Sequence, residues 1–283
     1  MKYRAPLILV VLVTLIAAFA FAQGQQATVE EADKLFEQKN YKEAATAYEE
    51  VAEARGQKWR YAAQKRVQSL LRLQLFDEAL EAAQEYVKMT EGTPYEARSQ
   101  RFLGNLYMTL PHWGYRAGGE FHRGQHGQGI YLRSWRYDKK HGVAHMERAR
   151  ELYEHYDNNR AELAPLPQDE EEGWHEERIG CIFDLANMVA QFSIYDDQPH
   201  YWYHYWGERD EFLAETAGED DFDEGYSTRQ WRRERPIGLR VGPDGKPIFP
   251  STPEDYSGEL KDDRKILFLL EEVRGLDNTE NSK

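Results

Sequence analysis

Cysteine is nearly absent from this chain of 283 residues, which contains one, Cys181. A single thiol excludes an intramolecular disulfide. The neighbours Ile179, Ile182 and Phe183 are apolar, and no base stands beside the thiol in the sequence. We therefore expect a buried core thiol rather than a reactive one. A G-x-S-x-G motif is also lacking, and the sequence predicts no catalytic residue, no cofactor and no enzyme.

Basic residues are in short supply, because 36 Lys and Arg face 50 Asp and Glu, which gives a formal net charge of -14. An acidic chain repels the phosphate backbone, so nucleic acid is not an expected partner. A transmembrane segment is not expected either. The one long apolar run covers residues 7–21, whereas a bilayer span needs about 20 residues.

That apolar run has the features of a targeting signal. Lys2 and Arg4 precede it, and small residues in an A-x-A arrangement end it. This composition is typical of a cleavable secretory signal peptide, which we place at residues 1–22. We expect an exported protein, periplasmic or extracellular, with no membrane attachment after the signal is removed.

Two stretches with apolar residues at helical spacing follow each other at an offset of 35 residues (76 − 41). The matching positions are Tyr41, Ala44 and Tyr48 in the first stretch and Phe76, Ala79 and Ala83 in the second. A bulky residue would open the second helix of each hairpin, and alanine would let two helices approach closely. Period and pattern resemble tetratricopeptide repeats, although the family's glycine before the interhelix turn is replaced by Lys39 and Gln74. The resemblance implies an array of helical hairpins that binds proteins.

A glycine-rich and aromatic-rich insert at residues 111–142 interrupts the third hairpin. We expect an ordered, irregular segment that wraps over the helices. Two histidine pairs with i, i+4 spacing are weak metal candidates: His122 with His126, and His141 with His145. Glycines around the first pair disfavour a helix, and the second pair lacks the H-E-x-x-H order. The alternative is that these histidines only form hydrogen bonds within the insert.

Residues 173–275 are predicted to form a C-terminal helical region, followed by a tail at 276–283. The one convincing β-hairpin lies at 237–249, turning at a Pro-Asp-Gly sequence. The final helix is expected over 259–274, with Gly275 as its C-cap.

A cluster of tyrosine and tryptophan follows residue 195. Its members Tyr201, Trp202, Tyr205 and Trp206 are a candidate ligand surface. Aromatic faces bind sugars and peptides, but clustered aromatic residues also form cores, and the sequence leaves both interpretations open.

From about Tyr95 onward the chain resembles the N-terminal helical part of bacterial alpha-2-macroglobulin-like proteins. The resemblance rests on the stretches LPHWGY at 110–115, GGEF at 118–121, GQG at 127–129 and GKPIF at 245–249. It implies the leading module, or a truncated form, of a protease trap. The thioester segment of that family has no counterpart here, because Cys181 is followed by Ile-Phe-Asp.

Together these features predict a mainly α fold. It consists of a tetratricopeptide-like helical hairpin array over 28–163 with the insert at 111–142, and one small β-hairpin. The expected function is protein–protein binding or scaffolding by a non-enzymatic exported protein, through a groove lined by the helices of the first two repeats. Its partner would be a protein or peptide. The alternatives are the macroglobulin-type module, and a carbohydrate-binding protein or metal-dependent enzyme that uses the insert.

Overall fold

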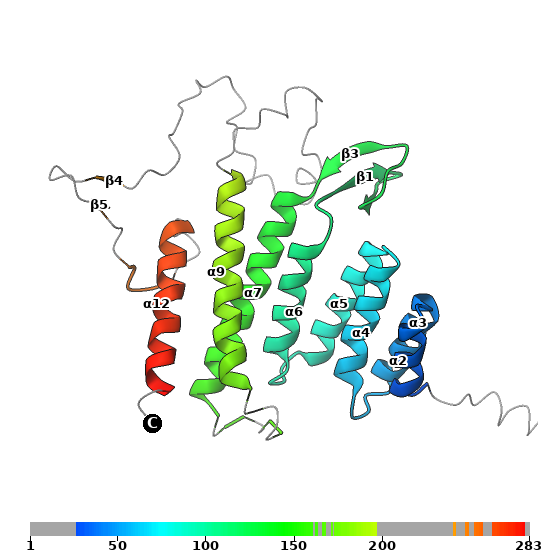
Figure 1. Cartoon of the computed structure of the whole chain (residues 1–283), viewed down its shortest axis with the longest axis horizontal. Coiled ribbons are helices and arrows are strands. Elements are labelled where there is room, and N and C mark those ends of the chain that lie inside the picture. The colour runs from blue at the N-terminus through cyan, green and yellow to red at the C-terminus, as the bar shows by residue number, and fades with distance from the viewer. Residues whose placement is uncertain are drawn as a thin grey trace, which may run out of the picture. The chain divides into compact units, whose positions relative to one another are not determined.

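The computed structural model describes residues 27–160, 162–163, 166–167, 171, 173–196, 240–241, 247–248, 252–256 and 262–280. Helices dominate it, and a small antiparallel sheet accompanies them, so the predicted mainly α fold class is confirmed (Figure 1). The chain divides into two compact units, Met1–Tyr86 and Val87–Lys283. Among the described helices, none combines the length and the apolar character that crossing a bilayer requires.

The first unit is built from helical hairpins. Its helices are α2 (Val29–Glu37), α3 (Tyr41–Glu53), α4 (Trp59–Arg72) and α5 (Phe76–Thr90), the last of which runs past the unit boundary. α2 packs on α3, and α3 packs on α4. The alanines predicted to allow close approach, Ala44 and Ala79, are fully buried. Small side chains thus set the distance between these helices, as the repeat pattern predicted.

The turns inside the two hairpins have the same geometry. Lys39 and Gln74 adopt positive φ angles of 64° and 59°. The next residue in each turn, Asn40 or Leu75, donates its N–H to the carbonyl oxygen five positions back, at 3.0 Å in both cases. This is the Schellman motif, in which a left-handed residue closes the end of a helix. The two motifs lie 35 residues apart (74 − 39), so the sequence period is also a structural period.

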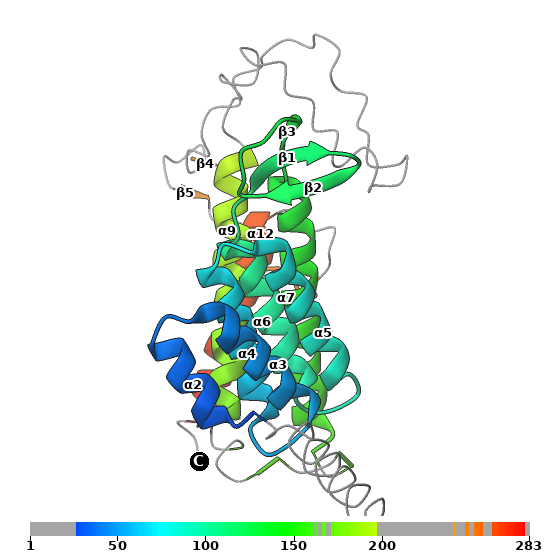
Figure 2. The same ribbon diagram turned by 90° about the vertical axis from the view of Figure 1, so that its right-hand side faces the viewer.

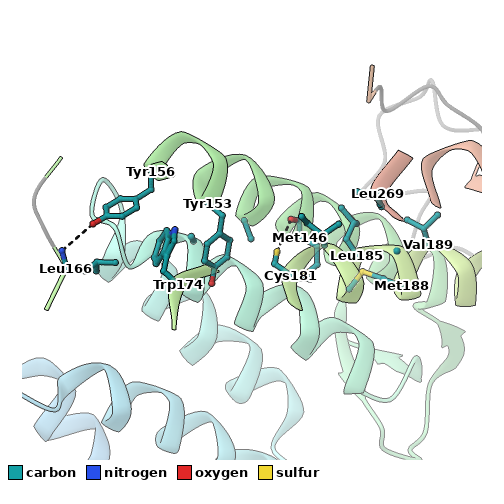
Figure 3. Close-up of a cluster of buried hydrophobic side chains, with 14 residues drawn as sticks. Met146, Tyr153, Tyr156, Leu166, Trp174, Cys181, Leu185, Met188, Val189 and Leu269 are labelled. Carbon is teal, nitrogen blue, oxygen red and sulfur yellow. Dashed lines mark hydrogen bonds between the residues drawn. The ribbon is translucent and has the colours of Figure 1, made fainter. Parts of the chain in front are cut away.

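The second unit contains four long helices among its described residues, α6 (Glu96–Thr109), α7 (Trp135–Asn158), α9 (Trp174–Asp196) and α12 (Asp262–Glu280). α7 packs between α6 and α9, and α9 packs on α12. Figure 3 shows their core, where the Trp174 indole lies beside the rings of Tyr153 and Tyr156. Cys181 is fully buried in this core, as predicted, and burial raises the pKa of its thiol to about 12.

Glycine allows α6 and α7 to approach closely. A Cβ at Gly104 would lie 2.6 Å from Met146 Cγ, well inside contact distance. Gly142 on α7 faces the same crossing, where an added Cβ would lie 3.2 Å from Tyr107 Cβ. The third hairpin therefore depends on small residues at its crossing, as the first two do.

A three-stranded antiparallel sheet stands between α6 and α7 in the chain. It contains β1 (Trp113–Ala117), β2 (Glu120–Arg123) and β3 (Ile130–Arg133) in the order β2-β1-β3 (Figure 2). The expectation of an irregular wrap was therefore wrong for this stretch. The missed signal is the pair Gly118-Gly119, whose φ angles of 62° and 91° are those of a two-residue type I′ hairpin turn. The predicted hairpin near residue 240 is present in its described part, where β4 (Arg240–Val241) pairs antiparallel with β5 (Pro247–Ile248).

The predicted end of the last helix was wrong. Gly275 does not cap α12 but lies inside it, and the helix continues to Glu280. Leu276 packs against the core of the unit just after the glycine. This apolar contact offsets the cost of about 1 kcal/mol that glycine imposes on a helix.

Candidate functional site

A polar and aromatic surface on α2 and α4 is the strongest candidate site in the first unit. Helical spacing places its members together on each helix: Asp33, Phe36 and Glu37 at i, i+3 and i+4 on α2, and Tyr61 and Lys65 at i and i+4 on α4. We call these five residues the Tyr61 surface. The repeat pattern predicted a groove on these helices, but these side chains follow no motif that marks them as a site.

Two phenol groups converge on one carboxylate oxygen. The hydroxyl groups of Tyr48 and Tyr61 donate to Asp33 Oδ1 at 2.6 and 3.0 Å. Tyr48 is completely buried, whereas Tyr61 keeps 41% of its surface exposed. The hydrogen bond from its hydroxyl group to Asp33 thus fixes the orientation of the exposed Tyr61 ring.

The electrostatic field at this surface is negative. Burial, the hydrogen bond to Asp33, and the charges of Asp33 and Glu37 raise the pKa of Tyr61 to about 12. The same causes raise the pKa of Tyr48, with burial the largest. Both hydroxyl groups therefore stay protonated and act as donors at every physiological pH.

One cation lies over the aromatic rings. The Lys65 ammonium is 4.7 Å from the centre of the Phe36 ring and 5.6 Å from the centre of the Tyr61 ring. These distances are typical of cation–π contacts. The ring of Phe36 in turn packs edge-on against Tyr48, with centroids 6.4 Å apart. The rings thus form a connected layer rather than isolated side chains.

Three other acidic residues of this unit, Glu30, Glu49 and Glu85, form ion pairs. Arg66 contacts both Glu49 and Glu85 at 2.6 Å, and Lys58 lies 3.0 Å from Glu30. Within residues 27–86, no such ion pair is formed by Asp33 or Glu37. The Tyr61 surface therefore carries a net negative charge, two carboxylates against the ammonium of Lys65, beside an exposed aromatic ring.

The second unit holds a buried polar network under the three-stranded sheet. Arg123 on β2 and Asp138 in the first turn of α7 are 2% and 0% exposed and form two hydrogen bonds, at 2.7 and 2.9 Å. The Ser134 hydroxyl donates to Asp138 Oδ2 at 2.6 Å, and His112 Nδ1 lies 2.8 Å from the same oxygen. Sequence reasoning missed this network, because its members are spread over residues 112–138 without a recognisable motif.

These residue types are those of a catalytic triad, but their connections differ. In a triad the serine hydroxyl faces the histidine, which in turn faces the carboxylate. Here Ser134 donates to Asp138 directly and is fully buried. The network therefore ties the sheet to α7 and exposes no nucleophile.

The first histidine pair lies on the sheet and its loop rather than on a helix. His122 stacks on Tyr115 with ring centres 4.8 Å apart, and His126 packs at a tilt against Trp113 with ring centres 4.7 Å apart. Gly127 lies against the Tyr115 ring, where a Cβ would come within 2.3 Å of Cζ. The glycines of the insert thus let its loop lie flat on the aromatic face of the sheet.

The second histidine pair lies on α7, where His141 and His145 both stack on Tyr107, at 5.7 and 5.8 Å. His145 Nδ1 lies 2.7 Å from Gln100 Oε1, and burial together with the charge of His141 lowers the pKa of His145 to about 4. Across the residues that the structure describes, no three His, Cys, Asp or Glu side chains converge as a metal site requires. The four histidines instead pack against aromatic rings in two separate places.

The remaining sequence candidates lie outside the described residues. These are the predicted signal peptide at 1–22 and the aromatic cluster Tyr201, Trp202, Tyr205 and Trp206. Comparison of the chain with protein families, with curated proteins and with solved structures gave no match.

Proposed function

We propose that this chain is a non-enzymatic helical-repeat protein that binds a protein or peptide partner through the Tyr61 surface. The observation that carries the proposal is the exposure of Tyr61 itself, at 41%, while its hydroxyl is held by Asp33. Exposed tyrosines with a fixed orientation are common among the residues that dominate binding energy at interfaces. They bring a large contact area and lose little conformational entropy on binding.

The repeat geometry supports a tetratricopeptide-like interpretation of the first unit. The Schellman turns recur at 35 residues (74 − 39), at the positions where that family has glycine. A regular array of helical hairpins presents a continuous face made from successive helices, and such faces bind partners. Asp33 and Tyr61 lie on helices that occupy equivalent places in consecutive hairpins.

We also propose that the protein acts outside the cytoplasm, on the strength of the apolar run at 7–21 and the A-x-A sequence that follows. The sequence similarity of the stretches at 110–121 and 245–249 supports a further proposal, that the chain is a leading module of an alpha-2-macroglobulin-like protein.

The binding proposal is tested with the full chain as bait in an extracytoplasmic extract. Wild type is compared with Tyr61→Ala and with Glu50→Ala, an exposed position on α3 away from the Tyr61 surface. A protein that is retained by wild type and by Glu50→Ala, but lost with Tyr61→Ala at unchanged melting temperature, supports the proposal. Equal retention by all three chains contradicts it. Oligomeric state and metal content are recorded on the same samples, and stoichiometric zinc would favour a metal-dependent function instead.

A further inference from the structure

We infer that the partner places a lysine or arginine side chain on the Tyr61 surface, between the exposed ring and the carboxylates of Asp33 and Glu37. This inference rests on the proposed function and specifies the chemistry of its ligand.

Charge is the first argument. The surface contains two carboxylates and one ammonium, which gives a net charge of −1 (−2 + 1). Within residues 27–86, neither Asp33 nor Glu37 has a cationic partner, whereas Arg66 alone neutralises two glutamates elsewhere in the unit. An incoming cation would therefore find acceptors that no described basic side chain already occupies.

Geometry is the second argument. Both tyrosine hydroxyls bind Asp33 Oδ1, and no described residue donates a hydrogen bond to Oδ2. The Tyr61 hydroxyl lies 3.0 Å from Oδ1 of this carboxylate, and 41% of the Tyr61 surface is exposed. A lysine or arginine stem covers an aromatic ring well, while its charged end reaches a neighbouring carboxylate.

Lys65 limits which cations fit. Its ammonium lies closer to Phe36 than to Tyr61, at 4.7 against 5.6 Å, so an incoming cation is repelled less over Tyr61 than over Phe36. An acidic partner segment would instead meet two carboxylates with only Lys65 to offset them. Like charges brought together at an interface oppose binding, so the surface disfavours acidic peptides.

The test is selection of random peptides displayed on phage against the immobilised full chain, with removal of phage that also bind Tyr61→Ala. Enriched peptides are then synthesised and titrated by fluorescence anisotropy. The inference predicts that they share a lysine or arginine at one position. Replacing it with methionine should weaken binding to wild type about tenfold, as expected for one cation–π contact plus one ion pair.

A double variant, Asp33→Asn with Glu37→Gln, separates charge from structure. Asparagine keeps the oxygen that accepts from Tyr48 and Tyr61, so the fold is retained while the charge is lost. The same methionine replacement should then weaken binding clearly less than in the wild type, by about threefold, because the ion pair is lost while the contact with the Tyr61 ring remains. Glu50→Gln, which removes an exposed acid from α3, should leave the wild-type response unchanged.

Two results would overturn the inference, and they differ in what else they affect. If the enriched peptides depend on Tyr61 but carry acidic residues or no common charge, the cationic ligand is wrong and the proposed binding function stands. If no peptide distinguishes wild type from Tyr61→Ala, both the inference and the proposed use of this surface for peptides are wrong.

Discussion

Lys39 and Gln74 adopt the left-handed backbone conformation that costs side-chain-bearing residues about 1–2 kcal/mol. Both side chains are exposed, so neither contributes packing that would be lost on truncation. We predict that Lys39→Gly and Gln74→Gly each raise the free energy of unfolding by about 0.5–1 kcal/mol, measured by urea denaturation. Glu50→Gly, inside α3, should lower it by about 1 kcal/mol. Destabilisation by both turn variants would contradict the strain that their φ angles indicate.

His145 makes stability depend on pH. Burial lowers its pKa from 6.5 to about 4, so the unfolded chain binds the proton first as pH falls. The contribution of the neutral imidazole is therefore complete above about pH 6.5 and declines as pH falls toward about 4. Urea denaturation at several pH values across this window should show a smaller loss of stability for His145→Gln than for wild type. His155→Gln, an exposed position on the same helix, serves as the control, and identical pH profiles for wild type and His145→Gln would contradict the prediction.

Among the helices, two glycines in similar secondary structure should respond in opposite ways to alanine. At Gly104 on α6 the new Cβ would lie 2.6 Å from Met146 Cγ and 3.1 Å from Gly142 O, so the α6–α7 crossing must widen. We predict that Gly104→Ala lowers the free energy of unfolding by about 1–3 kcal/mol. Gly275 in α12 has no described atom within 4 Å of an added Cβ, and Gly275→Ala should raise stability by about 0.5–1 kcal/mol. Thermal unfolding of the two variants tests this prediction. Stability changes of the same sign in both variants would contradict it.

The sheet depends on one buried ion pair. Arg123→Met would leave the fully buried Asp138 carboxylate without its main counter-charge. Removing one partner of such a pair costs about 3–5 kcal/mol. We expect faster hydrogen exchange in residues 113–133 and a lower melting temperature. Arg148→Met removes an arginine whose side chain is 51% exposed and should cost less than about 1 kcal/mol. Unchanged exchange in the Arg123 variant would show that the network does not hold the sheet.

The helices were predictable from the sequence because an amphipathic helix repeats its apolar residues locally. The 35-residue period located both hairpins and their turns. The sheet in the insert was missed, since its strands are short and mix aromatic and basic residues on the same face: Phe121 lies beside Arg123, and Trp113 pairs with Arg133. The face of the sheet that packs on α7 is marked by the hydrogen bond between Arg123 and Asp138, and these residues are 15 positions apart in the chain. The Tyr61 surface was missed for a similar reason, because Asp33 and Tyr61 are 28 residues apart.

At the scale of the whole molecule, the N-terminal segment should direct export. We predict that expression of the complete chain in a bacterium yields a periplasmic protein whose first residue is Gln23. Ala22→Arg should leave an uncleaved precursor, since the cleavage site requires small residues. Ala17→Ser, within the apolar run, is the matched control. N-terminal sequencing of the periplasmic fraction tests the prediction, and an intact N-terminus there would contradict it.

By itself, the sequence determined the helical character of the chain, the period of its hairpins and the burial of its one thiol. Each of these depends on residues close together in the chain, and local periodicity reveals them. Only the tertiary structure decided which side chains meet across elements: Asp33 with two tyrosines, Arg123 with Asp138, and His141 and His145 with Tyr107. Such contacts depend on the angles at which helices and strands pack, and no local pattern specifies those angles.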